Sequence, residues 1–307
     1  MTATPDMMSA LADAAKVFGL NLTDRTPPED RWLKANGLRM HYLDWGGSGK
    51  PILFLHGGNQ TAHTWDLVVA QLRRDYHCLA LDQRGHGETE APKGSDSSPQ
   101  AQREDVRAAI EALGLKHLAL VGMSMGGLNT IAYSGTYPER LAAVCIVDVG
   151  PTILKKGFDE TGSFIRGKRE FASMEEALDY AVDFNPTRPK AHLRYSLMHA
   201  LKQRPDGRWV WRYDQAQPAK PEDRKKQAEK VLAAYNKLWD VVPNIRCPAL
   251  VVQGSRSNVF TPELAAELAS KMPKGRWITI QDAGHTVQGD QPKAFADALR
   301  AFLRDAL

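Results

Sequence analysis

Short, nearly continuous apolar runs recur along this 307-residue chain and alternate with stretches that have a helical period. The runs lie at 51–55, 77–81, 117–121, 143–148, 247–252 and 276–280. Apolar runs without polar alternation are typical of strands that are buried on both faces of a parallel sheet. Two further strands, near 31–33 and 39–44, are predicted on either side of an Asn36-Gly37 hairpin turn. The pattern predicts an α/β fold with a mostly parallel central sheet covered by helices on both faces.

The pattern changes in two places outside this core. Residues 1–30 read as an N-terminal extension with one amphipathic helix over 8–18, broken by Pro27-Pro28. Between two core strands, the chain has no convincing buried strand but three helical stretches, near 173–184, 188–203 and 221–240. We therefore expect a core of 31–150 and 244–307, with 151–243 inserted as a helical cap, or lid.

One serine stands where a strand passes into a helix. Ser124 lies in Gly122-Met123-Ser124-Met125-Gly126, directly after the apolar run 117–121 and before a small-residue helical stretch. A tight turn between a strand and a helix lifts the serine hydroxyl out of the sheet as a nucleophile. Gly122 and Gly126 are suited to such a turn because a Cβ would collide where the two backbones meet. The alternative is a glycine-rich turn with an incidental serine.

A reactive serine needs a base and a site for the oxyanion. His285 follows the last strand run, in Ala283-Gly284-His285, which gives the chain order serine, acid, histidine. It would take the Ser124 proton and later return it to the leaving group. The strand at 51–55 breaks into His56-Gly57-Gly58, so we expect the N–H of Gly58 to be one oxyanion donor. The N–H of Met125, at the start of the following helix, would be the second.

Together these motifs resemble the α/β-hydrolase superfamily, in its serine-hydrolase form with a cap domain. Asp82-Gln83-Arg84-Gly85-His86-Gly87 is similar to the family's Asp-x-Arg-Gly-x-Gly segment, whose Asp and Arg are usually structural. The matching segments cover roughly 35–150 and 244–307. The resemblance implies the fold and a serine triad that uses no cofactor, and it says much less about the substrate.

The acid of the triad departs from the family pattern. The resemblance implies an aspartate after the strand at 247–252, but Asn258 stands there. Asp148, at the end of the strand 143–148, is a second carboxylate, and some relatives take their acid from this neighbouring strand end. We expect Asp148 to be the partner of His285. The alternatives are Asn258 as a weak orienting group, Asp282, no acid at all, or an Asp148 that only caps a turn.

Four residues beside the motifs are candidate substrate contacts. Asn59, His63 and Trp65 follow the predicted oxyanion loop, and Met123 replaces a histidine that is common beside the nucleophile in relatives. The aromatic side chains of the insertion are predicted mainly to form its own core. An apolar lid with few fixed charges predicts a neutral, largely apolar small-molecule substrate.

Three functions agree with these residues. The first is hydrolysis of a carboxylic ester or lactone through an acyl-enzyme on Ser124. The second is hydrolysis of a carbon–carbon bond in a ring-cleavage diketone, with Arg166, Arg188 or Arg194 holding a substrate carboxylate. The third is a non-catalytic binding protein on a decayed hydrolase scaffold, motivated by the missing aspartate at 258. Haloalkane dehalogenase and epoxide hydrolase chemistry are disfavoured because both need an aspartate in place of Ser124.

Composition favours a soluble enzyme, with 43% hydrophobic residues and a net charge of +4. The basic residues of the insertion are interleaved with acidic ones, as on a solvated helix, so nucleic-acid binding is not expected. No apolar run approaches the ~20 residues of a membrane helix, and no secretory signal is visible. Cys78, Cys145 and Cys247 lie in or beside apolar strand patterns, which predicts buried thiols and a cytoplasmic location. No Cys/His group has metal-ligand spacing, and nothing in the sequence specifies an oligomeric state.

Overall fold

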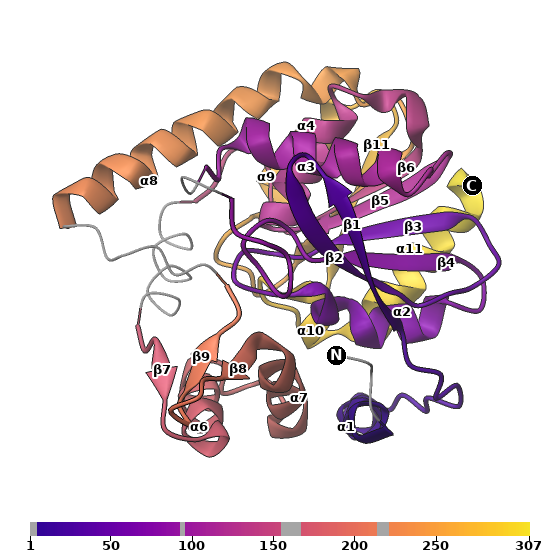
Figure 1. Cartoon of the computed structure of the whole chain (residues 1–307). Coiled ribbons are helices and arrows are strands. Elements are labelled where there is room, and N and C mark those ends of the chain that lie inside the picture. Colours follow the sequence, from indigo (N-terminus) through magenta and orange to yellow (C-terminus); the bar gives the residue numbers. More distant parts are fainter. Residues whose placement is uncertain (1–4, 93–95, 155–166, 214–220) are drawn as a thin grey trace.

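The computed structural model describes residues 5–92, 96–154, 167–213 and 221–307. Eight strands form one sheet in the order β1–β2–β4–β3–β5–β6–β10–β11 (Figure 1). Their bounds are β1 Glu29–Ala35, β2 Leu38–Asp44, β3 Pro51–Leu55, β4 His77–Leu81, β5 Leu118–Met123, β6 Leu141–Val147, β10 Ala249–Gly254 and β11 Gly275–Ile280. The strands β1, β2 and β4 pair antiparallel, and the pairs from β4 to β11 are parallel. The predicted fold class is confirmed.

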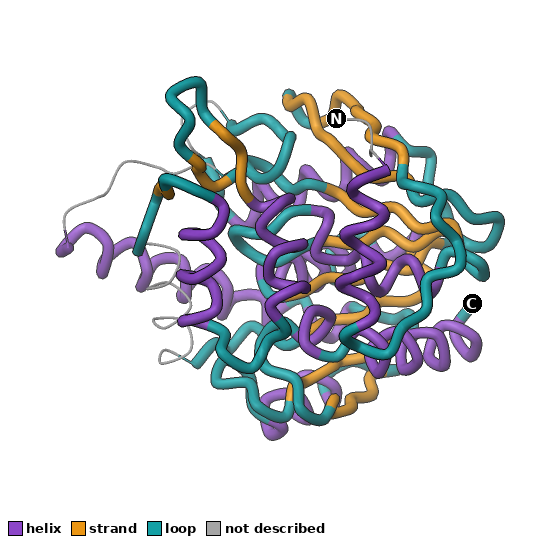
Figure 2. Tube along the Cα trace, turned by 90° about the horizontal axis from the view of Figure 1, so that it is seen from below, coloured by secondary structure: helices purple, strands orange, loops and turns teal. Residues whose placement is uncertain are grey.

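Helices cover the sheet on both faces, which explains why the central strands are apolar without alternation (Figures 1 and 2). The helices on one face are α1 Pro5–Lys16, α2 Asp66–Leu72, α10 Val287–Asp290 and α11 Pro292–Ala306. Those on the other are α3 Pro99–Ala112, α4 Met125–Ser134 and α9 Pro262–Ser270. All six residues of β5 are buried. Ala119 and Val121 pack into the first core, whereas Leu118 and Leu120 pack into the second.

The N-terminal extension is part of the first core. Leu11, Ala14 and Ala15 of α1 are fully buried and belong to the same apolar cluster as α2 and α11. Beyond the helix, Phe18 meets His192 of the insertion edge-on, with ring centroids 5.2 Å apart. The extension thus packs against both the core and the insertion, rather than standing apart as an appendage.

The insertion between β6 and β10 contains the three predicted helices, α6 Met174–Phe184, α7 Lys190–Ala200 and α8 Pro221–Asn236. It also contains a small antiparallel sheet, β7–β9–β8, that the sequence analysis missed, so it is not purely helical. The strands are β7 Glu170–Phe171, β8 Leu201–Gln203 and β9 Trp209–Trp211, too short for their pattern to be recognised. They share a separate apolar core with α6 and α7, whereas Tyr235 of α8 packs into the second core of the sheet. Figure 1 shows α8 on the far side of the insertion from α6 and α7.

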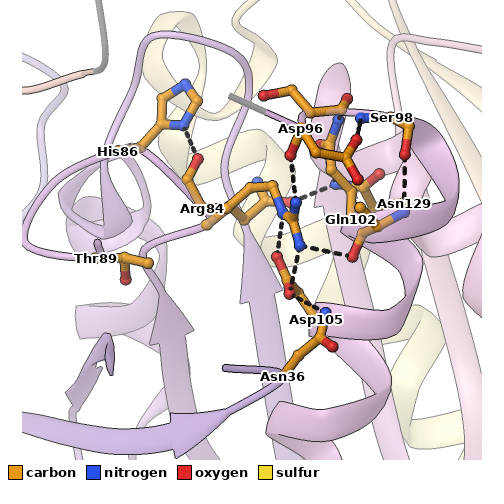
Figure 3. Close-up of polar contacts among 12 residues, drawn as sticks. Asn36, Arg84, His86, Thr89, Asp96, Ser98, Gln102, Asp105 and Asn129 are labelled. Carbon is orange, nitrogen blue, oxygen red and sulfur yellow. Dashed lines mark hydrogen bonds and ion pairs between the residues drawn. The ribbon is translucent and has the colours of Figure 1, made fainter. Parts of the chain in front are cut away.

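The loop that follows β4 is held by Arg84, whose side chain is buried against the start of α3 (Figure 3). Its guanidinium binds both carboxylate oxygens of Asp105 and donates to the carbonyl oxygens of Asp96 and Ala101. Asp105 also accepts a hydrogen bond of 2.7 Å from Asn36 in the β1–β2 turn. Arg84 therefore joins three segments that are distant in sequence, which agrees with the structural role expected from the resemblance.

Asp82, at the end of β4, holds a second set of segments together. Its Oδ1 accepts the N–H of Ala62 at 2.7 Å, and its Oδ2 lies 2.7 Å from Nδ1 of His41. Burial alone lowers the pKa of His41, but hydrogen bonds and charge from Asp30 and Asp82 outweigh it and raise this pKa to about 9. The imidazolium is therefore the stable form at neutral pH, and it ties β2 to β4.

No described helix has both the length and the apolar character that crossing a bilayer requires. The three cysteines are free thiols: Cys78 and Cys145 are buried, and Cys247 is partly buried.

The substitution Arg84→Met is expected to lower the free energy of unfolding by about 3–5 kcal/mol, because it leaves the Asp105 carboxylate buried without its cation. Urea unfolding followed by circular dichroism measures this. The matched control is Arg103→Met on α3, the helix that carries Asp105, because Arg103 pairs with Glu104 in a partly exposed position. Its effect should stay within about 0.5 kcal/mol. Equal losses for the two variants would refute the role given to Arg84.

Candidate active site

Ser124 occupies a strained turn between β5 and α4. Its backbone has φ 52° and ψ −117°, a conformation that L-residues rarely adopt. The turn is tight because a Cβ on Gly122 would overlap the carbonyl oxygen of Gly126, and one on Gly126 would overlap that of Leu55. The N–H of Ser124 donates to the carbonyl of Val147 at 3.0 Å, which fixes the turn to the neighbouring strand. Ser124 itself is partly exposed, so its hydroxyl is accessible.

Three of the residues expected at the site lie in one hydrogen-bonded chain. The Oγ of Ser124 is 2.9 Å from Nε2 of His285, and Nδ1 of His285 is 2.8 Å from Oδ2 of Asp148. Because an ionised carboxylate can only accept, the proton of the neutral imidazole belongs on Nδ1. Nε2 is then free to accept the serine proton.

Asp148 is completely buried at the end of β6, where its backbone has φ 54°. Its Oδ1 accepts the N–H of Gly254 at 2.8 Å. Its Oδ2 also accepts the hydroxyl of Ser257 at 2.5 Å, in addition to its contact with His285. The end of β10 and the loop after it, where the resemblance implies the acid, thus supply two hydrogen bonds to Asp148. The other carboxylate considered, Asp282, is exposed and pairs with Arg256.

His56, in the loop after β3, sets the direction of one backbone N–H, that of Gly58. The N–H of Gln83 donates to Nε2 of His56, so the ring proton is on Nδ1, which donates to the carbonyl of Gly57 at 2.7 Å. Burial lowers the pKa of His56 to about 4, which keeps the ring neutral. Because the peptide is trans, fixing the Gly57 carbonyl directs the N–H of Gly58 the opposite way.

The two oxyanion candidates lie on neighbouring segments. The N–H of Gly126 donates to the carbonyl of His56 at 3.1 Å, which joins the loop to the start of α4. The N–H of Met125 belongs to the first turn of α4, where an α-helix leaves its N–H groups without intrahelical acceptors. A Cβ added to Gly58 would meet no atom within 4 Å, whereas a Cβ added to Gly57 would lie 2.6 Å from Sδ of Met123. Gly57 is therefore the glycine that packing requires, and Gly58 faces open space.

The loop that carries His285 is held from the insertion. The N–H of Gly284 donates to Oδ2 of Asp290 at 2.8 Å. The Oδ1 of Asp290 accepts from Arg188, just before α7, at 2.9 Å from Nε and 2.5 Å from a terminal nitrogen. Both side chains are largely buried. Asp290 thus connects the insertion to the residue that precedes the base.

The four predicted substrate contacts lie in different surroundings. Asn59 is partly exposed and has φ 62°, directly after Gly58. Trp65 is completely buried and packs between Phe54 and Phe295, at centroid distances of 5.1 and 6.0 Å. Met123 is 1% exposed beneath Gly57.

The burial of Trp65 and Met123 gives neither residue a surface that a substrate could reach in this structure. His63 lines a cavity of about 370 Å³ to which Ser124, Asp148 and His285 do not contribute. Of the four, Asn59 is the residue that adjoins an oxyanion candidate.

Sequence reasoning missed four residues that hold the site in place: His56, Gly57, Ser257 and Asp290. His56 and Gly57 stand in the motif that was recognised, but their roles depend on which way one peptide faces. Ser257 stands beside Asn258, and nothing in its sequence context indicated that its hydroxyl would donate to Asp148. Asp290 carried no signal, because its partners are a backbone N–H and an arginine 102 positions away.

Residues 50–292 match the α/β hydrolase fold family. An esterase of Mycobacterium tuberculosis is 32% identical over 97% of this chain and 96% of its own length. A 3-hydroxybutyrate-oligomer hydrolase of Cupriavidus necator is 27% identical over 86% of this chain and 92% of its own length. A solved structure of the M. tuberculosis esterase, from work on its inhibition by transition metals, is similar to this chain with a TM-score of 0.76. The two chains are 30% identical, and the similarity covers 97% of this chain and 99% of that one. With its motifs, sheet order and similarity to these proteins, the chain belongs to the α/β-hydrolase family.

Proposed function

We propose that the protein is a serine hydrolase that cleaves a carboxylic ester or lactone through an acyl-enzyme on Ser124. The observation that carries this proposal is the hydrogen-bonded chain from Ser124 through His285 to the buried Asp148. The similarity to an esterase along nearly the whole chain agrees with it.

In the first half of the reaction, Nε2 of His285 takes the proton of Ser124 while Oγ attacks the ester carbonyl carbon. The resulting tetrahedral oxyanion accepts from the N–H groups of Gly58 and Met125. When the carbon–oxygen bond breaks, His285 returns the proton to the leaving alkoxide, which departs as an alcohol. In a lactone this alcohol stays attached to the acyl group.

In the second half, His285 takes a proton from water, whose oxygen attacks the acyl carbon and forms a second tetrahedral oxyanion. The bond to Ser124 then breaks, Oγ recovers a proton from His285, and the carboxylic acid leaves. Throughout, Asp148 stabilises the imidazolium and keeps the Nδ1 proton in place. Its hydrogen bonds from Gly254 and Ser257 stabilise the ionised carboxylate for this work.

The contacts of two arginines argue against carbon–carbon bond hydrolysis. Arg188 is paired with Asp290, and Arg194 is paired with Glu175 through two hydrogen bonds. Neither is therefore available to hold a substrate carboxylate without first breaking an ion pair. The third arginine considered, Arg166, lies outside the described residues.

The missing aspartate at 258 was the reason to consider a non-catalytic protein. The contact of Asp148 with His285 argues against that alternative, because it is the contact that an aspartate at 258 would make.

We infer further that the insertion serves as a cap that admits a neutral, largely apolar substrate. The three free cysteines support a reducing, cytoplasmic location.

Treatment with a fluorophosphonate is expected to phosphonylate Ser124, because the nucleophile is activated by His285. Mass mapping of the modified peptide measures this. The labelling should disappear in His285→Ala and persist in His117→Asn, an exposed histidine outside the site. If Ser124 of the native enzyme stays unmodified, the hydrolase proposal falls.

The substitution Asp148→Asn is expected to reduce kcat on p-nitrophenyl esters by at least ~100-fold, because an amide stabilises the imidazolium poorly and can fix the wrong tautomer. Asn258→Ala should have a small effect in the same assay. If Asn258→Ala reduces kcat more than Asp148→Asn does, Asp148 is not the acid of the triad.

The substitution Asp290→Asn is expected to reduce kcat by about 10-fold with little change in KM, because the Gly284–His285 loop loses a charged acceptor that fixes the position of the base. The rate of fluorophosphonate labelling should fall in parallel. Asp297→Asn on α11, where Asp297 forms exposed ion pairs, is the control and should leave both rates unchanged. Equal rates in the two variants would leave Asp290 with a packing role alone.

A further inference from the structure

A polar cluster that the proposed mechanism does not use lies where the insertion meets the core. It consists of His63 in the short helix η1 (Ala62–Trp65), Asp66 at the start of α2, and His199 near the end of α7. One ligand atom from each residue can be chosen so that all three lie within 4.8 Å of one another. Nδ1 of His63 is 2.7 Å from Oδ2 of Asp66, and the rings of His63 and His199 stack with centroids 3.6 Å apart.

Two atoms of this cluster are buried without a partner among the described residues. Oδ1 of Asp66 and Nε2 of His199 have no hydrogen bond there, although Asp66 is only 1% exposed. Buried polar atoms nearly always have a partner, and an exception calls for a water or an ion. Oδ1 of Asp66 is an electron-pair donor, and so is Nε2 of His199 when its ring proton is on Nδ1. In that tautomer both atoms can serve as ligands of one cation. A water bound to the same two atoms, by contrast, would give an ordinary hydrogen-bonded site without a metal.

The set of donors specifies the kind of cation. Two imidazole nitrogens and one carboxylate oxygen are ligands typical of Zn²⁺ and its neighbours in the transition series, which bind three protein groups and leave a fourth position for water. Mg²⁺ and Ca²⁺ prefer sites made of oxygen ligands alone and would bind weakly to this set of donors. We propose that His63, Asp66 and His199 bind one divalent transition-metal ion of the zinc type.

The surroundings agree with such an ion. Tyr195 of α7 donates its hydroxyl to Oδ2 of Asp66, so the carboxylate is already oriented by a neighbouring group, as the outer partners of metal ligands usually do. His63 and His199 both line the cavity of about 370 Å³, which gives an ion a route to the cluster. Asp30, Asp82 and Glu88 also line this cavity, which attracts a cation, while Arg212 and His41 partly offset them.

Binding requires a limited rearrangement. Zinc lies about 2.0–2.2 Å from nitrogen and oxygen ligands, so donors up to 4.8 Å apart must move inward. One of the stacked rings must also turn, because a ligand nitrogen holds its ion near the plane of its own ring. His63 is partly exposed toward the cavity and has room to turn.

The site would connect the core to the insertion. His63 and Asp66 follow the loop of Gly57 and Gly58 in sequence, whereas His199 belongs to the insertion. A bound ion would therefore fix α7 to the core and stabilise the folded chain in proportion to its affinity. This inference does not depend on the proposed hydrolysis.

The test is equilibrium dialysis of tag-free Ser124→Ala protein against ZnCl₂, with 1 mM Mg²⁺ present as a competitor that should have no effect. We expect one zinc ion per chain, and an increase of Tm on adding zinc. His63→Gln and His199→Gln should each weaken zinc binding by at least ~10-fold and abolish the Tm increase. Because catalysis is absent from this variant, failure of the metal site and failure of the hydrolase proposal are distinguished.

His117→Asn is the matched control, because His117 is exposed and distant from the cluster in the loop before β5. Its zinc affinity should equal that of the parent. Circular dichroism of each variant in EDTA verifies folding, and Tyr195→Phe, which keeps all three ligands, serves as the milder variant that should weaken binding about 10-fold. The proposal is overturned if the parent binds no zinc, or if its affinity is unchanged in both histidine variants.

Discussion

The close approach of three backbone segments is the constraint on which the site depends. The start of α4 lies against the end of β3 so closely that any side chain at position 126 would overlap the carbonyl of Leu55, and position 122 is equally crowded. This contact forces Ser124 into its strained conformation. It also sets the start of α4 against the loop that carries Gly58, so the two candidate oxyanion donors are brought together by the same packing that exposes the nucleophile.

Much of this architecture could be predicted from the sequence because its causes are local. Buried strands such as β5 and β10 read as unbroken apolar runs, and the Asn36-Gly37 turn requires the positive φ angles that its residues adopt. What could not be predicted depends on partners that are remote in the chain. Tertiary contacts decide the packing of α1 on the core, the three-stranded sheet of the insertion, and the burial of Trp65 at the end of η1. A tryptophan that follows an oxyanion loop has the same sequence context whether it faces a substrate or the core.

Asp148 shows how two neighbouring strand ends can offer a carboxylate to the same imidazole. The ends of β6 and β10 are neighbours in the sheet, so a carboxylate at Asp148 and one at position 258 can approach the same imidazole from adjacent strands. Gly254 at the end of β10 and Ser257 in the loop after it both donate to Asp148. The hydroxyl of Ser257 donates to Asp148, whereas a second buried carboxylate close to Asp148 would repel it. The absence of an aspartate at 258 is therefore coherent with its presence at 148.

The insertion contacts the core at two places that adjoin segments of the candidate site. Arg188 holds Asp290, and Asp290 holds the peptide before His285, while Tyr195 and His199 of α7 meet Asp66 and His63 just after the loop of Gly58. These contacts lead to the peptide before His285 and to the segment after Gly58, and all start from α7 or from Arg188 just before it. A displacement of α7 would thus disturb both sets of contacts together. This geometry links the position of the insertion to that of the candidate site residues on both segments.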